Sequence, residues 1–182
     1  MMIRQATKED INEIKNIIDD LQVSREQKDW ERAEYGFFEY KKSKGELTKL
    51  INPYFTVAET KKGIGGFLLA YDDNLFKKLH KNSTLVDWKF ILNNFKQDFL
   101  YWDMLAVSNP KTQDSKNVSK KLIDYTFDLS RKNNIKKVVG FVCERPWLSK
   151  RGRGVIIKNG FKKFKEVEID NGITLGAYEL NL

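Results

Sequence analysis

Apolar residues recur at helical spacing near the start of the chain. The stripe of this first predicted helix consists of Ile11, Ile14, Ile17, Ile18 and Leu21. The preceding segment, Met2 to Gln5, predicts a short strand. Thr7 and Asp10 lie three residues apart at the start of the helix, which is a variant of the capping box. A strand followed directly by an amphipathic helix therefore opens the fold.

Two apolar runs further along predict a β-hairpin. Tyr54 to Thr60 and Ile64 to Tyr71 are separated by Lys61-Lys62-Gly63, which is typical of a tight turn. The pair Gly65-Gly66 inside the second strand indicates either a bulge or the close approach of another backbone segment. Between the first helix and this hairpin, residues 28–51 predict a helical region with many aromatic side chains. These aromatic side chains either belong to the hydrophobic core or line a pocket: Trp30, Tyr35, Phe37, Phe38 and Tyr40.

The segment from Asp72 to Asp98 is longer than a plain link between two strands. It contains two short helical patterns, Leu75 to His80 and Leu85 to Phe95. We interpret it as an insertion, about residues 72–98, that packs near the mouth of a site or contacts a partner. His80, the single histidine, is expected to face solvent, and no ligand pair occurs at metal-binding spacing.

A strand-to-helix junction follows the insertion. The strand is Leu100 to Val107, the connecting loop is rich in Ser, Asn and Lys, and Val118 and Leu122 mark the buried face of the next helix. A helix N-terminus presents unpaired N–H groups and a partial positive charge, so a diphosphate can bind there, with Lys116 and Lys120 adding charge. The alternative is an ordinary junction that binds nothing.

The last third of the chain predicts a strand, a helix and a closing hairpin. The strand is Ile135 to Val142. The helix, Trp147 to Lys158, contains Gly152 and Gly154, and each costs about 1 kcal/mol relative to alanine, so we expect it to begin late, near Arg153. The hairpin consists of Phe161 to Ile169, a turn at Asp170-Asn171-Gly172, and Ile173 to Leu180.

The composition suits one globular domain. The 182 residues are 41% hydrophobic and 13% aromatic, enough to build a core. Lys and Arg outnumber Asp and Glu by 33 to 25, which gives a net charge of +8. The surplus is concentrated between Lys136 and Lys165, where the one acid is Glu144. Such a patch attracts the phosphates of a cofactor, an acidic protein, RNA or a membrane surface, or it is simply a solvated basic face.

Cysteine content and apolar runs indicate the compartment. The one cysteine, Cys143, excludes an internal disulfide, and its setting in VVGFVCE predicts a buried strand position. The start MMIRQATKEDI has no apolar signal-peptide core, and no apolar run approaches about 18 residues. We therefore expect a cytoplasmic protein that does not enter a membrane.

In the order of its predicted strands and helices and in three short motifs, the chain resembles the GNAT superfamily of acyl-CoA-dependent N-acetyltransferases. The motifs are Ile3-Arg4-x-Ala6-Thr7-x-x-Asp10, then Leu105-Ala106-Val107 with a proline and the polar loop after it, and then Asn159-Gly160-Phe161 before the sixth strand. The resemblance implies a single GNAT-like domain over residues 1–182. It also implies an α/β (α+β) fold, with a mixed, mostly antiparallel sheet of six or seven strands, flanked by helices and splayed between strands four and five.

Acetyl-CoA as cosubstrate is a further implication of the resemblance. In the family, the fourth strand contacts the pantetheine arm and the loop–helix junction contacts the diphosphate. Those places, together with one serine before the later helix, are occupied here by Leu105, Ala106, Val107, Gln113, Asp114, Ser115, Lys116, Asn117, Val118, Ser119, Lys120 and Ser149. The family's diphosphate loop usually reads Arg/Gln-x-x-Gly-x-Gly/Ala, whereas this chain has Asp114, Asn117 and Ser119 at the specified positions and Gln113 one residue early. An acid beside a diphosphate repels it unless the acid points to solvent or pairs with a lysine.

Acetyl transfer to an amine also needs a group that accepts the amine proton. Glu144 is the first candidate, because it falls just after the predicted fifth strand, where the ribosomal-protein acetyltransferases of the family carry a glutamate. Asp103 is the second, because alternation places it on the face of the fourth strand opposite Trp102 and Met104. Either could instead be a salt-bridged or solvated carboxylate. The tyrosine that many members use to protonate the thiolate would fall near Ile156 and is absent; solvent or another tyrosine would replace it, from Tyr101, Tyr125 and Tyr178.

These features predict an N-acetyltransferase that moves an acetyl group from acetyl-CoA to a primary amine in a ternary complex. Its partners would be CoA and the amine acceptor, with a homodimer left open and no membrane partner. One alternative is a GNAT-fold CoA-binding or interaction module that has lost acetyl transfer, suggested by the glycine-poor loop and the missing tyrosine. The other is a basic nucleic-acid-associated protein, which the absence of a recognisable nucleic-acid motif disfavours.

Overall fold

The computed structural model describes residues 1–21, 42–108, 113–146, 148–169 and 172–182. The described strands are β1 (Met2–Gln5), β2 (Phe55–Thr60), β3 (Gly63–Asp72), β4 (Phe99–Val107), β5 (Lys137–Arg145), β6 (Lys162–Ile169) and β7 (Ile173–Asn181). The described helices are α1 (Ile11–Leu21), α3 (Lys44–Lys49), α4 (Asp73–His80), α5 (Val86–Asn94), α6 (Gln113–Lys132) and α7 (Lys150–Lys158). The strands form one sheet in the order β1-β2-β3-β4-β5-β7-β6.

This sheet confirms the predicted fold class. The pairs β1–β2, β2–β3, β5–β7 and β6–β7 are antiparallel, whereas β4 and β5 are parallel. The parallel ladder joins Phe99–Trp102 to Lys137–Gly140, four of the nine residues of each strand. By residue contacts the chain divides into two compact units, Met1–Ala70 with Asp103–Leu129 and Tyr71–Trp102 with Ser130–Leu182.

In the first unit, Arg4 of β1 fixes the start of α1. Its guanidinium donates to both carboxylate oxygens of Asp10, at 2.7 and 2.8 Å, and to Glu59 of β2 at 2.7 Å. The N–H of Thr7 donates to Asp10 Oδ2 at 2.8 Å, which is the reciprocal half of the predicted capping box. These bonds, chiefly those from Arg4, hold the pKa of Asp10 below its ordinary value.

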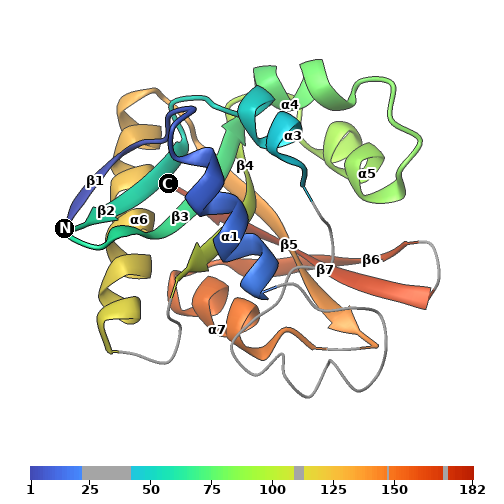
Figure 1. Cartoon of the computed structure of the whole chain (residues 1–182). Coiled ribbons are helices and arrows are strands. Elements are labelled where there is room, and N and C mark those ends of the chain that lie inside the picture. Colours follow the sequence, from blue (N-terminus) through green and yellow to red (C-terminus); the bar gives the residue numbers. More distant parts are fainter. Residues whose placement is uncertain (22–41, 109–112, 147, 170–171) are drawn as a thin grey trace. The chain divides into compact units, whose positions relative to one another are not determined.

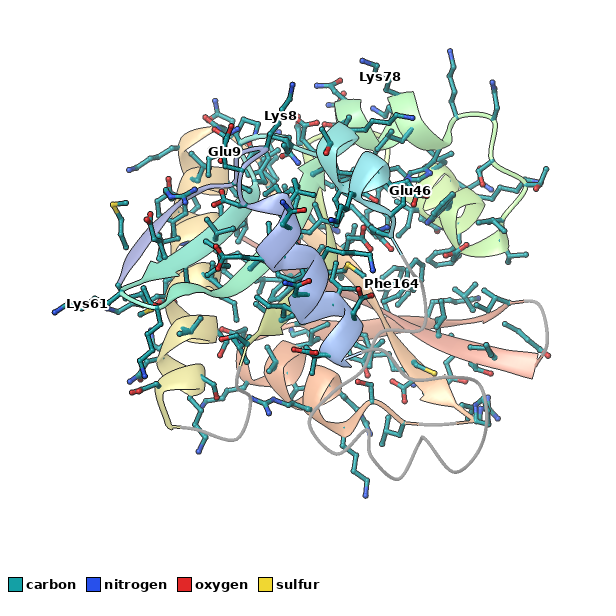
Figure 2. The ribbon with its side chains drawn as sticks, viewed as in Figure 1. Lys8, Glu9, Glu46, Lys61, Lys78 and Phe164 are labelled. Carbon is teal, nitrogen blue, oxygen red and sulfur yellow. The ribbon has the colours of Figure 1, made fainter. Side chains whose placement is uncertain are left out.

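The β2–β3 hairpin has the predicted turn and the predicted bulge. Ala58 pairs with Gly66 and Glu59 with Ile64, so Gly65 is the extra residue of the second strand. Gly63 in the turn has φ +105°, a conformation that glycine adopts without strain. Figure 2 shows Lys61, in this turn, pointing away from the ribbon.

Helix α6 packs on the β2–β3 part of the sheet in the first unit (Figure 1). Its apolar stripe is buried as predicted, with Val118 and Leu122 almost fully covered. Within this contact the hydroxyl groups of Thr56 and Thr126 lie 3.3 Å apart, so two buried polar groups satisfy each other. The helix that follows the candidate diphosphate junction is therefore firmly packed on β2 and β3.

In the second unit the insertion forms two helices, as predicted. The Asp72 carboxylate accepts the N–H of Leu75 at 2.9 Å and so caps α4. Phe164 of β6, labelled in Figure 2, packs against Phe90 and Phe95 with ring centroids 5.7 and 5.5 Å apart. The insertion is therefore attached to the sheet of this unit through aromatic side chains.

His80 is buried, so its expected exposure was wrong. It lies one helical turn after Phe76, and its ring centroid is 3.6 Å from that of Trp88 in α5. The hydroxyl of Tyr71 is 3.4 Å from His80 Nε2. The charged residues around it in sequence concealed this position, because only the docking of α4 onto β3 decides which side of the helix faces the core.

Three further expectations for the C-terminal part need correction. Strand β5 continues to Arg145, so Glu144 lies inside the strand rather than after it. Helix α7 begins at Lys150 rather than near Arg153, because packing of its buried residue Ile156 outweighs the glycine propensities. Cys143 is only half-buried, since the strand there is irregular.

Two expectations lie wholly or partly outside the described residues. Of the predicted aromatic helical region, the structure describes α3, where Ser43 and Glu46 form a reciprocal capping box. The five aromatic residues of that region fall within residues 22–41, which the structure does not describe. The same holds for Asp170 and Asn171 of the last hairpin turn, where Gly172 has φ +73°.

Candidate functional site

The strand-to-helix junction of the first unit differs from the expected diphosphate loop. Helix α6 begins at Gln113, so residues 114–120 are helical rather than a loop. The positive end of the helix dipole lies at the first turn, residues 113–115. A diphosphate at this helix end would therefore bind at the start of the predicted range, Gln113 to Lys120, and not along the whole of that range.

The side chains of this helix end divide into buried and exposed ones. Ser115 and Val118 are buried, and the Ser119 hydroxyl donates to the carbonyl of Ser115 at 3.1 Å. Exposed side chains are those of Asp114, Lys116, Asn117 and Lys120. The exposed lysines and the positive end of the helix dipole favour an anion, and the exposed acid at 114 opposes it.

The end of β4 approaches β3 closely in the same unit. The N–H and hydroxyl of Ser108 both donate to the carbonyl of Gly65, at 2.9 and 3.2 Å. A Cβ atom at Gly66 would lie 2.6 Å from the carbonyl oxygen of Ala106 and 3.1 Å from a methyl of Val107. Both readings of the glycine pair are thus confirmed, since Gly65 bulges and Gly66 permits the close approach. Leu105, the remaining predicted pantetheine contact, is half-buried on the same strand.

A hollow of about 530 Å³ lies on the flank of α6. Its described lining includes Thr60 of β2 and the α6 residues Asp114, Asn117, Lys120, Lys121 and Asp124. The Lys120 ammonium and Asp124 carboxylate pair at 2.5 Å across one helical turn. Acids and lysines therefore balance in this hollow, and net charge gives it no preference for an anion.

Glu144 occupies a special position in the second unit. Cys143 pairs with Leu175 and Arg145 with Thr174, so Glu144 is the extra residue of a β-bulge. Its side chain crosses Gly176 of β7, where an added Cβ would lie 2.6 Å from Glu144 Oε1. The bulge and the glycine together turn this carboxylate across the neighbouring strand.

Two partners hold the Glu144 carboxylate. The hydroxyl of Tyr178, on β7, donates to Oε1 at 2.5 Å, and Lys163 Nζ of β6 is 3.5 Å from the same oxygen. Burial, then the hydrogen bond to Glu144 and its charge, raise the pKa of Tyr178, while the Arg153 guanidinium acts in the opposite direction. Tyr178 therefore stays protonated and acts as the donor. The Glu144 side chain retains 10% of its surface exposed.

Asp103 has a different environment in the first unit. Its Oδ2 atom is buried and lies 3.0 Å from Lys42 Nζ. Both side chains are more than four-fifths covered, at 16% and 19% exposure. Asp103 is thus a salt-bridged carboxylate, which is one of the alternatives to a catalytic base that the sequence left open.

Ser149 is the N-cap residue of α7, and its side chain makes no capping hydrogen bond. Its N–H donates to the carbonyl of Cys143 at 3.0 Å, which ties the start of α7 to β5 beside Glu144. Arg153, one turn later, has a buried Nε atom without a hydrogen-bond partner in the described structure.

The candidate residues thus gather in two groups. The first unit holds Asp103, the end of β4 and the first turns of α6, and the second holds Glu144 and Ser149. The sequence reasoning did not foresee the bond between Tyr178 and Glu144, nor the role of Gly176. No local pattern reveals them, because they depend on the register between β5 and β7. Among the described residues no group of three potential ligands could hold a metal ion, and none of the described helices is long and apolar enough to span a membrane.

This architecture is the GNAT N-acetyltransferase fold, as comparison with solved structures shows. The chain is similar to Ard1 from Thermoplasma volcanium, with 12% identity, a TM-score of 0.68 and coverage of 100% of this chain and 97% of that one. It is similar to the ribosomal-protein-alanine N-acetyltransferase from Brucella melitensis, with 11% identity, a TM-score of 0.66 and full coverage of both chains. The PaiA N-acetyltransferase from Thermoplasma acidophilum, solved in complex with coenzyme A, has 16% identity, a TM-score of 0.63 and coverage of 100% and 98%. No protein-family model and no curated protein matches the sequence.

Proposed function

We propose that this chain is a cytoplasmic N-acetyltransferase that transfers the acetyl group of acetyl-CoA to a primary amine, with Glu144 as the general base. The observation that carries this proposal is the Glu144 carboxylate, which a bulge and a glycine turn across β7 and which keeps part of its surface exposed. Fold likeness to N-acetyltransferases supports the reaction class.

The residues present fit an acetyl-CoA cosubstrate. The first turn of α6 offers the positive end of its helix dipole to the diphosphate, and Lys116 and Lys120 add positive charge. The end of β4, Leu105 to Val107, supplies backbone groups for the pantetheine arm. The thioester supplies an activated acetyl carbon and a thiolate leaving group.

Proton transfer is the step assigned to this chain's side chains. The amine must lose a proton to attack the thioester, and Glu144 accepts it directly or through one water. A backbone N–H of β4 polarises the carbonyl oxygen as it becomes anionic. The leaving thiolate takes its proton from solvent. Asp103, already paired with Lys42, is the weaker candidate base.

The substitution Glu144→Gln tests this proposal. We expect turnover to fall about 100-fold or more, with CoA affinity nearly unchanged, because only the proton acceptor is lost. The defect should shrink at high pH, where the amine is already deprotonated. Glu166→Gln is the matched control, since Glu166 is an exposed acid on β6 that pairs with Lys163 and Arg145. Equal turnover of Glu144→Gln and wild type across the pH range would overturn the assignment.

A second candidate function is a CoA-binding or interaction module without transferase activity. The exposed acid at 114, in the turn that would hold the diphosphate, opposes CoA and so favours the interaction module. Thermal shift with CoA measures whether CoA binds, because a ligand at 100 times its dissociation constant stabilises a protein by about 2.7 kcal/mol, and an acetylation assay then separates the enzyme from the module. Stabilisation by CoA without acetylation of any amine or peptide N-terminus would identify the module. The homodimer stays a prediction, which sedimentation analysis would test.

A further inference from the structure

We propose that Tyr178 is a positioning residue for the base: its hydroxyl fixes the Glu144 carboxylate in one orientation. This rests on the proposed function, in which Glu144 accepts the amine proton. Tyr178 touches neither reactant in this proposal and acts through Glu144.

The geometry of the pair supports this role. Tyr178 is 1% exposed, and its hydroxyl donates to Glu144 Oε1 at 2.5 Å. The same residue in β7 pairs with Gly140 of β5 and Lys163 of β6, so its backbone is held on both sides. A rigid tyrosine therefore locates Oε1, while Oε2 accepts no hydrogen bond from the described residues and is the oxygen left to receive a proton.

Gly176 shows that the contact is built into the sheet. A Cβ at this position would lie 2.6 Å from Glu144 Oε1 and 2.8 Å from the Tyr178 ring. Both side chains thus cross the same glycine to meet, and a larger residue would push them apart. The bulge at Glu144 is required as well, because it takes Glu144 out of the regular alternation of β5.

Charged side chains of β5, β6 and α7 surround the pair of Glu144 and Tyr178. Lys163 of β6 faces Glu144 Oε1 at 3.5 Å, and its ammonium is bonded more closely to Glu166, at 2.6 Å. Arg153 of α7 faces the Tyr178 hydroxyl, and Arg145, beside Glu144 in the chain, pairs with Glu166. The Tyr178 hydroxyl is therefore the nearest donor to Glu144. Without it, the carboxylate would lose its shortest hydrogen bond and would be free to turn toward Lys163.

The substitution Tyr178→Phe removes the hydroxyl and keeps the ring. We expect turnover at neutral pH to fall about tenfold, with the KM for the amine and the CoA affinity unchanged, because the base is still present but is no longer held in one orientation. Tyr71→Phe is the matched control, since it also removes a buried tyrosine hydroxyl from the second unit, the one near His80. A Tyr178→Phe enzyme that is less stable but has wild-type turnover per folded molecule would overturn the proposal.

A measurement without turnover separates this inference from the proposed function. The carbon-13 NMR chemical shift of the Glu144 carboxyl at neutral pH should differ between Tyr178→Phe and wild type, because the hydrogen bond to Oε1 is lost. If wild type acetylates amines and this chemical shift is unchanged in the variant, the inference fails and the proposed function stands. If wild type transfers no acetyl group, the proposed function fails, and the chemical shift still decides whether Tyr178 holds Glu144. Should Tyr178→Phe not fold, ultraviolet titration of Tyr178 in Glu144→Gln replaces it: a fall in the tyrosine pKa supports the pairing, and no change overturns it.

Discussion

The backbone at Gly66 lies so close to the carbonyl oxygen of Ala106 that a Cβ atom there would approach to 2.6 Å. Two valine methyl groups, from Val107 and Val118, bound the same space at 3.1 and 3.0 Å. The glycine of β3 is thus part of what brings the end of β4 and the start of α6 together.

Gly66→Ala should therefore destabilise the protein. Because the nearest neighbour is backbone and cannot rotate away, we expect a loss of about 1–3 kcal/mol in the free energy of unfolding, and weaker CoA binding. Urea denaturation and CoA titration measure the two effects. Gly154→Ala is the control, since a Cβ there meets nothing within 4 Å and should stabilise α7 by up to about 1 kcal/mol. Equal stability of Gly66→Ala and wild type would show that β4 shifts without cost.

Asp114→Gln should raise the affinity for CoA by about 3- to 10-fold, because it removes an exposed negative charge from the turn that would hold the diphosphate. The same change should lower the stability of the free protein by up to about 1 kcal/mol, since an acid in the first helical turn is favourable. Calorimetry with CoA and thermal unfolding give both values. Asp128→Gln, farther along the same helix, should leave CoA affinity alone. Unchanged affinity in Asp114→Gln would place the diphosphate elsewhere.

Asp103→Asn should keep turnover within about threefold of wild type, because Asp103 is already paired with Lys42 and is not the proposed base. It should cost about 1–3 kcal/mol of stability, since it leaves a largely covered lysine without its counter-ion. Steady-state kinetics and denaturation on one preparation test both statements. A loss of turnover as large as that of Glu144→Gln would transfer the role of base to Asp103.

Asp10→Asn should destabilise the protein by about 1–3 kcal/mol at neutral pH, because Asp10 accepts two hydrogen bonds from Arg4 and two from Thr7. The folded pKa of Asp10 lies below the ordinary value of 3.8, so the stabilisation is complete above that value and is lost as the pH falls through the folded pKa. The stability difference between wild type and variant should therefore shrink in acid. Asp19→Asn, which breaks an exposed ion pair with Lys15 on the same helix, should cost no more than about 0.5 kcal/mol. A difference that is constant with pH would show that the ionised carboxylate contributes nothing.

The sequence by itself determined most of the elements. The spacing of apolar residues and the residues at turns predicted α1, the β2–β3 hairpin, both helices of the insertion and the buried stripe of α6, because these features depend on residues close together in the chain. The glycine pair Gly65-Gly66 predicted a bulge or the close approach of another backbone segment, and the structure has both, because glycine permits each. The motif order predicted the fold class.

Only the tertiary structure decided the environment of the chemical groups. His80 looked exposed in its lysine-rich setting and is buried against Trp88. Glu144 and Tyr178 are 34 residues apart in the chain and meet because β5 lies beside β7 with a bulge at Glu144. Neighbours in sequence fix local conformation, whereas the register between distant strands fixes which side chains touch.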